Sequence, residues 1–316
     1  MHPLLARSLD RLIIRLAVNA MPEPDQHKPH AAEATALLGH PDFFCDFVQS
    51  PGEFEFIVGN HFQFKSAIST PWKKNNLVRG RLFTGARNWQ SFPTVILLHG
   101  WNDEMSYRWR LPFVAKRLAR QQVNTILLEL PYHSHRRPDS PGAINDFISE
   151  DLWRMVEATR QSIADTRATV KWLASAGCER IGIWGTSLGA WLTGLIIGHE
   201  PKLKFAVLTT PVTQIERVIN ELAFCAPIRR SHANSKVPLS TLNLDSHRPK
   251  IPVANILIQE AEHDLFAPKE AIEDLWVAWS QPEIWRLPHG HISLLASIPL
   301  MTRTVNWIAE KSRSEM

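Results

Sequence analysis

Five residues near the middle of the chain have the composition of a sharp turn that presents a nucleophile. The run Gly185-Thr186-Ser187-Leu188-Gly189 lies between a strand predicted at 180–184 and a helix predicted at 188–199. Small flanking residues let strand and helix approach closely, and the turn exposes the serine hydroxyl at the helix N-terminus, where free N–H groups favour negative charge. Ser187 is therefore the predicted nucleophile, and a structural turn serine is the alternative.

Two histidines follow the last predicted strand, at 284–287, and either could be the general base that a serine nucleophile requires. We favour His291, because the preceding Gly290 lets the loop turn and a helix-like segment follows. His289 is the alternative base.

A third group must orient the base, and carboxylates follow the strand predicted at 253–259. Asp264 is best placed, four residues before Pro268, where a helix can restart. Glu262 is the alternative. The predicted chain order is nucleophile, acid, base, which matches one of the known triad arrangements.

A second loop could supply a hydrogen-bond donor to the oxyanion that forms during acyl transfer. His99-Gly100-Trp101-Asn102-Asp103 follows an apolar strand predicted at 94–98. Its backbone N–H, most simply that of Trp101, would act together with the N–H of Leu188. His99 is expected to be a structural hydrogen-bonding residue rather than a catalyst, and Asp103 could orient the loop.

The surrounding elements alternate between apolar strands and helices, which predicts an α/β protein with a mostly parallel central sheet covered by helices on both faces. In such sheets, sites collect beyond the carboxyl ends of the strands, where the residues above lie. Three earlier segments are predicted as antiparallel strands at the sheet edge, at 54–58, 62–68 and 77–83. Further strands are expected at 124–130 and 204–209, and helices at 108–121, 151–176 and 300–311.

The composition excludes several classes of protein. With 316 residues, 44% of them hydrophobic and 21% charged, the chain is neither disordered nor collagen-like. No apolar run approaches the roughly 18–20 residues that span a bilayer. The net charge of +4 comes without a long basic run, so no nucleic-acid partner is expected. Three widely spaced cysteines, Cys45, Cys178 and Cys225, favour a reducing, cytoplasmic compartment.

Residues 1–50 precede the predicted sheet and hold an amphipathic helix and a linker. Leu5, Leu9, Leu12, Ile13 and Leu16 share one face of a helix over 1–20, with Arg7, Arg11 and Arg15 on another. The helix could pack on the body of the protein or on a second subunit of a homo-oligomer. It could instead lie on an anionic membrane surface, as a peripheral contact. Residues 21–30 are predicted to be the linker.

A segment at about 212–250, between two predicted strands, mixes apolar and basic residues and is predicted to be a short helical lid over Ser187. It contains Phe224 and Cys225. We predict that His133, Trp191 and Phe224 lie at the substrate pocket.

The chain resembles α/β-hydrolase-fold serine hydrolases in four motifs taken together. These are the pentapeptide around Ser187, His99-Gly100, Asp264 with Pro268, and Gly290-His291. The resemblance implies an α/β-hydrolase domain over 51–316 with the lid inserted in it. It further implies hydrolysis of a carboxylic ester or thioester, from a small or lipid-like substrate, through an acyl-serine intermediate and without a metal or organic cofactor.

Two alternatives remain. The fold can be retained as a non-catalytic binding module. The HxH pairs His133-x-His135 and His289-x-His291 could instead ligate zinc in a metal-dependent hydrolase, although no accompanying ligand motif is present.

Overall fold

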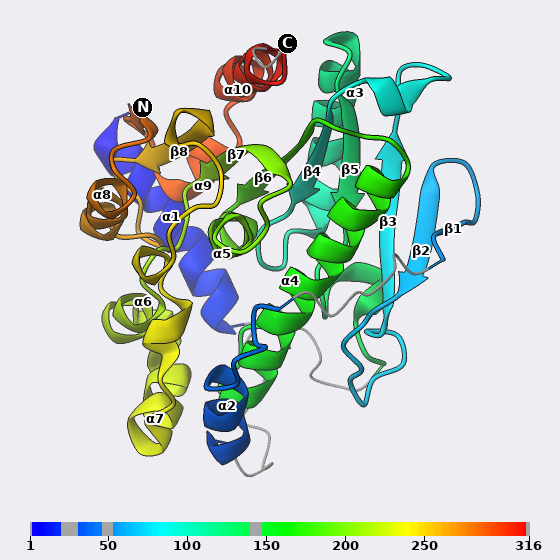
Figure 1. The fold of residues 1–316 in the computed structure, drawn as a ribbon. Helices are drawn as coiled ribbons and strands as arrows, with labels where there is room; N and C mark the ends of the chain where they lie inside the picture. The colour runs from blue at the N-terminus through cyan, green and yellow to red at the C-terminus, as the bar shows by residue number, and fades with distance from the viewer. Residues whose placement is uncertain (1, 20–30, 46–52, 140–146, 314–316) are drawn as a thin grey trace.

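A nine-stranded mixed sheet forms the centre of the protein in the computed structural model (Figure 1), which describes residues 2–19, 31–45, 53–139 and 147–313. The strand order is β1-β2-β3-β5-β4-β6-β7-β8-β9. The first three strands run antiparallel at one edge, and β3 pairs antiparallel with β5, whereas all pairs from β5 to β9 are parallel. The strands are β1 (Glu55–Phe56), β2 (His61–Lys65), β3 (Leu77–Phe83), β4 (Thr94–Leu98), β5 (Asn124–Leu128), β6 (Ile181–Thr186), β7 (Leu203–Thr209), β8 (Ile256–Ala261) and β9 (Glu283–Leu287).

Helices cover both faces of this sheet. The inner strands β4, β5 and β6 are buried along their whole length, as expected for parallel strands between two helical layers. The helices are α1 (Pro3–Asn19), α2 (Ala31–Leu38), α3 (Leu111–Arg120), α4 (Leu152–Ser175), α5 (Leu188–Ile197), α6 (Ile215–Glu221), α7 (Ala226–Ser235), α8 (Lys269–Ala278), α9 (His291–Leu295) and α10 (Ile298–Lys311).

Alternation along β4 divides the apolar residues into two cores. Ile96 and Leu98 face the larger core, which includes residues of α4 and α5. Val95 and Leu97 face the other core, which α3 and α10 cover. Successive strand side chains point to opposite faces, so a single strand can serve both layers. The expected α/β architecture, with its antiparallel edge, is confirmed.

Several predicted boundaries are corrected by the structure. The single helix expected at 108–121 is divided into a π-helical turn at Ser106–Arg110 and α3, which begins at Leu111. Pro112 lacks an N–H group, so it fits the first turn of a new helix better than the interior of a longer one. The strand expected at 253–259 begins only at Ile256, because Val253–Asn255 form a 3₁₀ turn after Pro252.

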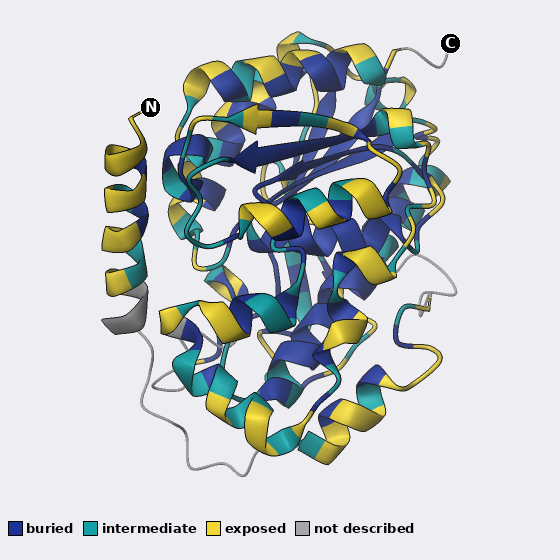
Figure 2. Cartoon of the chain, turned by 90° about the vertical axis from the view of Figure 1, so that its left-hand side faces the viewer, coloured by how far each residue is buried: buried dark blue, intermediate teal, exposed yellow. Residues whose placement is uncertain are grey.

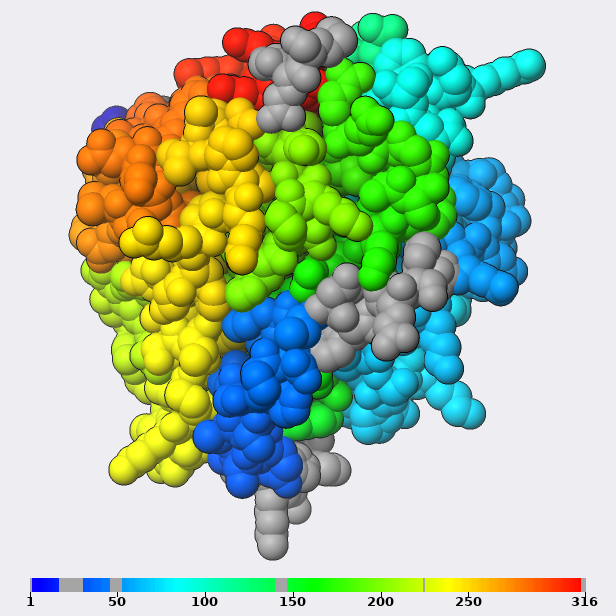
Figure 3. Space-filling model, in the orientation of Figure 1, coloured from blue at the N-terminus to red at the C-terminus, as the bar shows by residue number. Residues whose placement is uncertain are grey.

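The N-terminal region contains two helices rather than one. The linker predicted at 21–30 lies outside the described residues, but α2 follows and packs on α4, with Ala34 and Leu38 in the larger core. In the space-filling view α2 forms part of the visible surface, whereas α1 is almost entirely hidden from that side (Figure 3). Within the described ranges no helix is both long and apolar enough to cross a membrane.

The turn between β6 and α5 is the tightest approach of strand to helix near the predicted nucleophile. A Cβ atom on Gly185 would come within 2.0 Å of the Gly189 carbonyl oxygen, and one on Gly189 within 2.3 Å of the Leu98 carbonyl oxygen. Between them, Ser187 has φ +55° and ψ −116°, a conformation that side-chain-bearing residues rarely adopt. The two glycines therefore permit the close approach of α5 to β4 and β6 and the strained turn between them.

Replacing Gly185 with alanine should destabilise the protein, because the new methyl group meets a main-chain atom that cannot move aside. We expect the free energy of unfolding in urea to fall by about 3 kcal/mol or more. The matched control is Gly85→Ala, where the nearest atom to the added carbon lies at an ordinary 3.5 Å. A Gly185→Ala protein as stable as the control would show that the elbow relaxes freely.

Candidate active site

Ser187 stands at the carboxyl end of β6, where the chain turns into α5. Its N–H donates to the Thr209 carbonyl at the end of the neighbouring β7, at 2.9 Å. Its Oγ lies 2.9 Å from Nε2 of His291. The strained turn thus directs the hydroxyl at an imidazole rather than at its own helix.

His291 is the first residue of α9, after β9, and its ring lies between the serine and a carboxylate. Nδ1 lies 2.7 Å from Oδ2 of Asp264, in the loop after β8. The other carboxylate oxygen of Asp264 accepts hydrogen bonds from the N–H groups of Phe266 and Ala267, at 2.7 and 2.9 Å. The side chains of His291 and Asp264 are only 3% and 0% exposed. The acid is therefore fixed by its own loop and, through its second oxygen, fixes the tautomer of the ring.

The structure brings together the residues that the sequence favoured and keeps the alternatives apart. Nδ1 of His289 lies 3.3 Å from Oγ of Ser293 within its own turn. Glu262 follows β8 directly, and its N–H donates to the Leu287 carbonyl as the sheet pairing with β9 ends. Of the two histidines and two acids considered, His291 and Asp264 are the pair in hydrogen-bond contact with each other, and His291 also contacts Ser187.

The electrostatics around His291 favour its charged form. Complete burial acts to lower the pKa of His291, but the Asp264 carboxylate outweighs it, with smaller contributions from Asp10 and Asp103, and the pKa is raised above its ordinary value. The raised pKa makes His291 a stronger proton acceptor, because the Asp264 carboxylate stabilises the imidazolium that forms when the ring takes a proton.

The loop after β4 lies next to Ser187. A Cβ atom on Gly100 would be 3.5 Å from Cβ of Ser187, so the main chain of this loop passes close to the hydroxyl. Leu188 opens α5, and the N–H groups of a first helical turn lack intrahelical acceptors. The predicted oxyanion donors, the amides of Trp101 and Leu188, thus belong to two segments that meet at the serine. Their distances to an oxyanion stay a prediction.

Two buried histidines hold this loop from behind. Nδ1 of His99 lies 2.7 Å from the Gly100 carbonyl, and its Nε2 accepts from the Leu130 N–H. His133 accepts from the Asn102 N–H at Nε2, at 3.2 Å, with Nδ1 2.8 Å from the Pro131 carbonyl. Burial lowers the pKa of both rings, and that of His133 strongly. Both are therefore neutral acceptors that shape the loop.

Asp103 and Arg110 brace the other side of the same loop. Asp103 accepts from the Ser106 N–H at 3.2 Å, and its second oxygen lies 3.5 Å from Nη2 of Arg110. The same Arg110 nitrogen lies 3.4 Å from Oγ1 of Thr186, the residue before the nucleophile. The expected orienting contact of Asp103 is thus present, through an arginine that the motif did not indicate.

The structure buries two of the three residues predicted at the substrate pocket. Trp191 is 2% exposed and donates its indole N–H to the Leu242 carbonyl, so it packs in the core beneath the lid segment. His133 is also 2% exposed, behind the oxyanion loop. The side chain of Phe224 lies outside what the structure describes. Direct contact of these residues with a substrate stays a prediction.

Sequence reasoning missed one residue that reaches both loops of the site. Asp10, on α1, is fully buried and accepts hydrogen bonds from the main-chain N–H groups of Leu265, His291 and Ile292. The one available signal in the sequence was that Asp10 is the acidic residue of a helix with three arginines, and that it lies four residues from both Ala6 and Ile14. That pattern alone does not name a partner so far along the chain.

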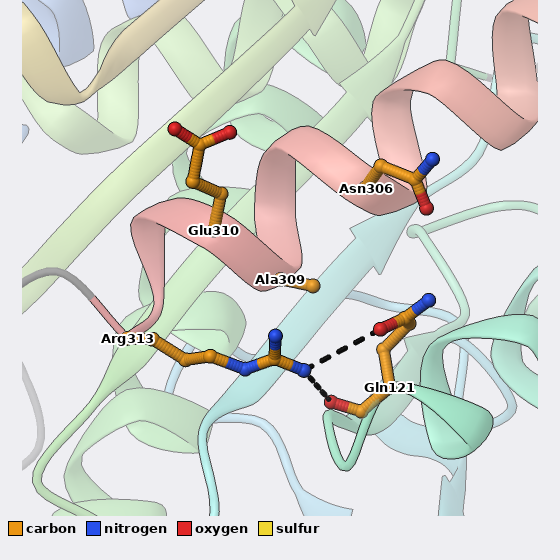
Figure 4. Close-up of a pocket in the computed structure, with 5 residues that line it drawn as sticks. All are labelled: Gln121, Asn306, Ala309, Glu310 and Arg313. Atoms are coloured by element: carbon orange, nitrogen blue, oxygen red, sulfur yellow. Dashed lines mark hydrogen bonds between the residues drawn. The ribbon is translucent and has the colours of Figure 1, made fainter.

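The described residues contain no group of three His, Cys, Asp or Glu side chains arranged to hold a metal ion. Of the HxH pairs, His133 is engaged with main-chain groups, and Nδ1 of His135 lies 2.7 Å from a Glu129 oxygen. A surface hollow between α10 and the end of α3 is polar, with Arg313 donating to Gln121 (Figure 4). Gln121 precedes β5, so this hollow lies at the amino ends of the parallel strands, whereas Ser187 lies at their carboxyl ends.

Two sequence comparisons place the chain among known proteins. A family model described as alpha/beta hydrolase domain containing 18 matches residues 76–214, which include the elbow and the oxyanion loop. Two uncharacterized proteins of Mycobacterium tuberculosis, one from strain CDC 1551 and one, Rv2627c, from strain H37Rv, are each 29% identical over 184 residues. These matches cover 56% of this chain and 44% of the relatives, so the similarity extends over less than half of their length.

Solved structures share the architecture at low identity. The acetyl xylan esterase of Paenibacillus sp. R4 is 14% identical with a TM-score of 0.59, covering 94% of this chain and 98% of that one. The Pyrococcus furiosus esterase Pf2001 is 16% identical with a TM-score of 0.54, over 82% and 93%. At such identities the likeness establishes the fold. The strand order and the matched family model agree with this α/β-hydrolase fold.

Proposed function

We propose that the protein is a serine hydrolase that cleaves a carboxylic ester or thioester through an acyl-serine intermediate. The observation that carries this proposal is the continuous hydrogen-bonded chain from Asp264 through His291 to Ser187, with contacts of 2.7 and 2.9 Å. A serine hydroxyl becomes a useful nucleophile only when a neighbouring base accepts its proton. The esterases among the structural relatives support the same reaction class.

In the proposed mechanism, Ser187 Oγ attacks the substrate carbonyl while Nε2 of His291 takes its proton. The tetrahedral oxyanion is held by the amides of Leu188 and Trp101, each of which would lower the barrier by roughly 3–4 kcal/mol. His291 then gives the proton to the leaving alcohol or thiol, which departs as the carbonyl re-forms. In deacylation the same nitrogen takes a proton from water as its oxygen attacks the acyl carbonyl. His291 then returns that proton to Ser187 Oγ as the bond between Oγ and the acyl carbon breaks and the carboxylic acid departs.

The apolar side chains of the predicted lid segment, 212–250, favour an acyl group as the part of the substrate that binds beside them. Val218 and Cys225, from this segment, pack with Trp101 of the oxyanion loop and Phe266 of the acid loop. The ring of Phe266 lies 4.8 Å from that of His291. We propose that these apolar side chains border the acyl-binding region, so that the lid sets acyl preference.

The setting we propose is cytoplasmic. All three cysteines are described and are present as thiols, two of them buried, as expected in a reducing compartment.

The first test replaces Ser187 with alanine, which removes one oxygen from the site. We expect wild-type protein to form a single adduct with a fluorophosphonate probe, and Ser187→Ala to form none and to lose about 10⁶-fold in kcat on a p-nitrophenyl ester. The control is Ser175→Ala, an exposed serine on α4. A folded wild-type protein that neither reacts with the probe nor hydrolyses esters would instead favour a non-catalytic binding module.

The second test follows the pH dependence of kcat/KM. The base must be neutral, so activity rises with pH through the pKa of His291, which Asp264 raises. Asp264→Asn removes that stabilisation of the imidazolium, so the acid limb should move to lower pH while kcat falls about 10⁴-fold. Glu262→Gln, the neighbouring carboxylate, should leave the limb in place. An unmoved limb in Asp264→Asn would contradict the assigned role of this carboxylate.

A further inference from the structure

The N-terminal helix α1 touches the catalytic loops through one buried carboxylate. We infer that Asp10 is a positioning residue, which clamps the acid loop and the base loop into the geometry that the reaction requires. This inference rests on the proposed function. It assigns to a helix outside the sheet a part in forming the site.

Both oxygens of the Asp10 carboxylate are used. Oδ2 accepts from the N–H of Leu265, at 3.2 Å, and from the N–H of His291, at 2.9 Å. Oδ1 accepts from the N–H of Ile292, at 3.1 Å. Asp10 is fully buried, so water does not compete for these donors. Burial raises the pKa of Asp10, and the N–H groups of Ile292 and His291 act in the opposite direction by favouring its ionised form, to which hydrogen bonds are roughly twice as strong as neutral ones.

These three donors belong to the two loops that must meet for the proton relay. Leu265 follows Asp264 directly, and the His291 amide belongs to the base itself. One oxygen therefore bridges the acid loop after β8 and the base loop after β9, beside the 2.7 Å contact between the two side chains. The residues joined are 281 positions apart in the sequence, so α1 supplies a constraint that the local turns do not.

The approach of α1 to the base loop is close enough to require glycine at position 290. A Cβ atom there would lie 2.9 Å from the Ala6 carbonyl oxygen and 2.9 Å from Oδ2 of Asp10. One turn further along α1, Ile14 packs against the cluster of Val218 and Cys225, against which Trp101 of the oxyanion loop also packs. The inner face of α1, formed by Ala6, Asp10 and Ile14, thus reaches the base loop and the acid loop directly, and shares an apolar cluster with the oxyanion loop.

The experiment compares Asp10→Asn and Asp10→Ala with Arg11→Gln, a charge change on the exposed side of the same helix. An asparagine keeps one acceptor oxygen and turns an amino group toward the other donors. We expect the rate of fluorophosphonate labelling to fall about 10-fold in Asp10→Asn and about 100-fold in Asp10→Ala, and to be unchanged in Arg11→Gln. Asp10→Asn is nearly isosteric, so it keeps the measurement available if Asp10→Ala yields no folded protein.

Two further readouts separate positioning from a general loss of stability. Hydrogen exchange should rise in peptides covering 262–268 and 289–295 in the Asp10 variants, and not in the sheet. Of the carboxylates that raise the pKa of His291, which are Asp264, Asp10 and Asp103, only one is lost, so the acid limb of kcat/KM should also move to lower pH in Asp10→Asn. Unchanged labelling and unchanged exchange in both loops would overturn the inference.

The outcome is distinguishable from failure of the proposed function. If wild-type protein does not react with the probe, the serine hydrolase proposal fails, and hydrogen exchange alone decides the clamp. Increased exchange confined to the two loops in Asp10→Asn would then support the clamp, and equal exchange in Asp10→Asn and Arg11→Gln would overturn it.

The outer side of α1 carries a second, independent inference. Leu5, Leu12 and Leu16 form a stripe along this helix and are 62%, 52% and 55% exposed. Exposed positions of the helix lie on its side away from the body of the protein (Figure 2). The helix contacts the body of the protein through the face around Asp10, not through these leucines. The neighbouring exposed face carries three arginines, Arg7, Arg11 and Arg15, and the one acidic residue of the helix is buried.

This pattern of charge and apolar side chains points to an anionic lipid surface as the occupant of the outer face. Leucines can enter the boundary between headgroups and acyl chains while arginines pair with lipid phosphates. The helix would lie in the plane of the surface, with its inner face still on the catalytic loops.

Vesicle co-sedimentation tests this inference with protein at full length. We expect binding to mixed phosphatidylglycerol and phosphatidylcholine vesicles to exceed binding to phosphatidylcholine alone. The double variant Leu12→Ser/Leu16→Ser should lose at least about 10-fold in partitioning. Val277→Ser, an exposed valine on α8, is the control. Unchanged binding in the double variant would overturn the inference, as would a wild-type dimer that this variant dissociates, which would assign the face to a second copy.

Discussion

The 2.9 Å contact between Ser187 Oγ and Nε2 of His291 is the interaction on which the chemistry of this protein depends, and most of the architecture serves to hold it. The serine is fixed by a strained turn that two glycines permit, and the imidazole by a carboxylate that its own loop holds. Because β6, β8 and β9 run parallel in one sheet, the three loops that follow them lie at the same end of the strands. The relay is therefore built from loops whose positions the sheet sets, and its accuracy depends on how firmly each loop is held there.

Different contacts hold each of the loops that form the site. The elbow is held by main-chain contacts with β4 and β7, and the oxyanion loop by His99, His133 and the Asp103–Arg110 pair. The acid and base loops emerge from β8 and β9, and β9 is an edge strand of the sheet in the part of the chain that the structure describes. This edge is where α1 docks and where the Asp10 carboxylate joins the two loops. This sheet edge thus receives support from a helix outside the sheet.

Local sequence signals were sufficient for the elbow, the sheet and the catalytic candidates. Gly185 and Gly189 are required by backbone contacts within one turn, and Asp264 and His291 follow strands whose ends must lie together. The inner face of α1 could not be found this way. Its apolar pattern indicated the leucine stripe, yet the docked face is set by a small residue, Ala6, opposite Gly290 and by Asp10 opposite three amides. That match depends on a contact across 281 residues, which no local pattern encodes.

The pKa values of the three histidines of the site are shifted in opposite directions, and this separates catalysis from loop integrity. Burial lowers the pKa of His99 and His133, whereas the nearby carboxylates raise that of His291. As pH falls, His291 is therefore protonated first, and its lone pair is lost to catalysis while the other two rings still accept the Leu130 and Asn102 amides. Because their folded-state pKa values are depressed, the contribution of these two rings to stability is complete above the ordinary histidine pKa and is lost as the pH falls from that value toward the folded-state pKa. The acid limb of the reaction consequently reports the base in an intact loop framework.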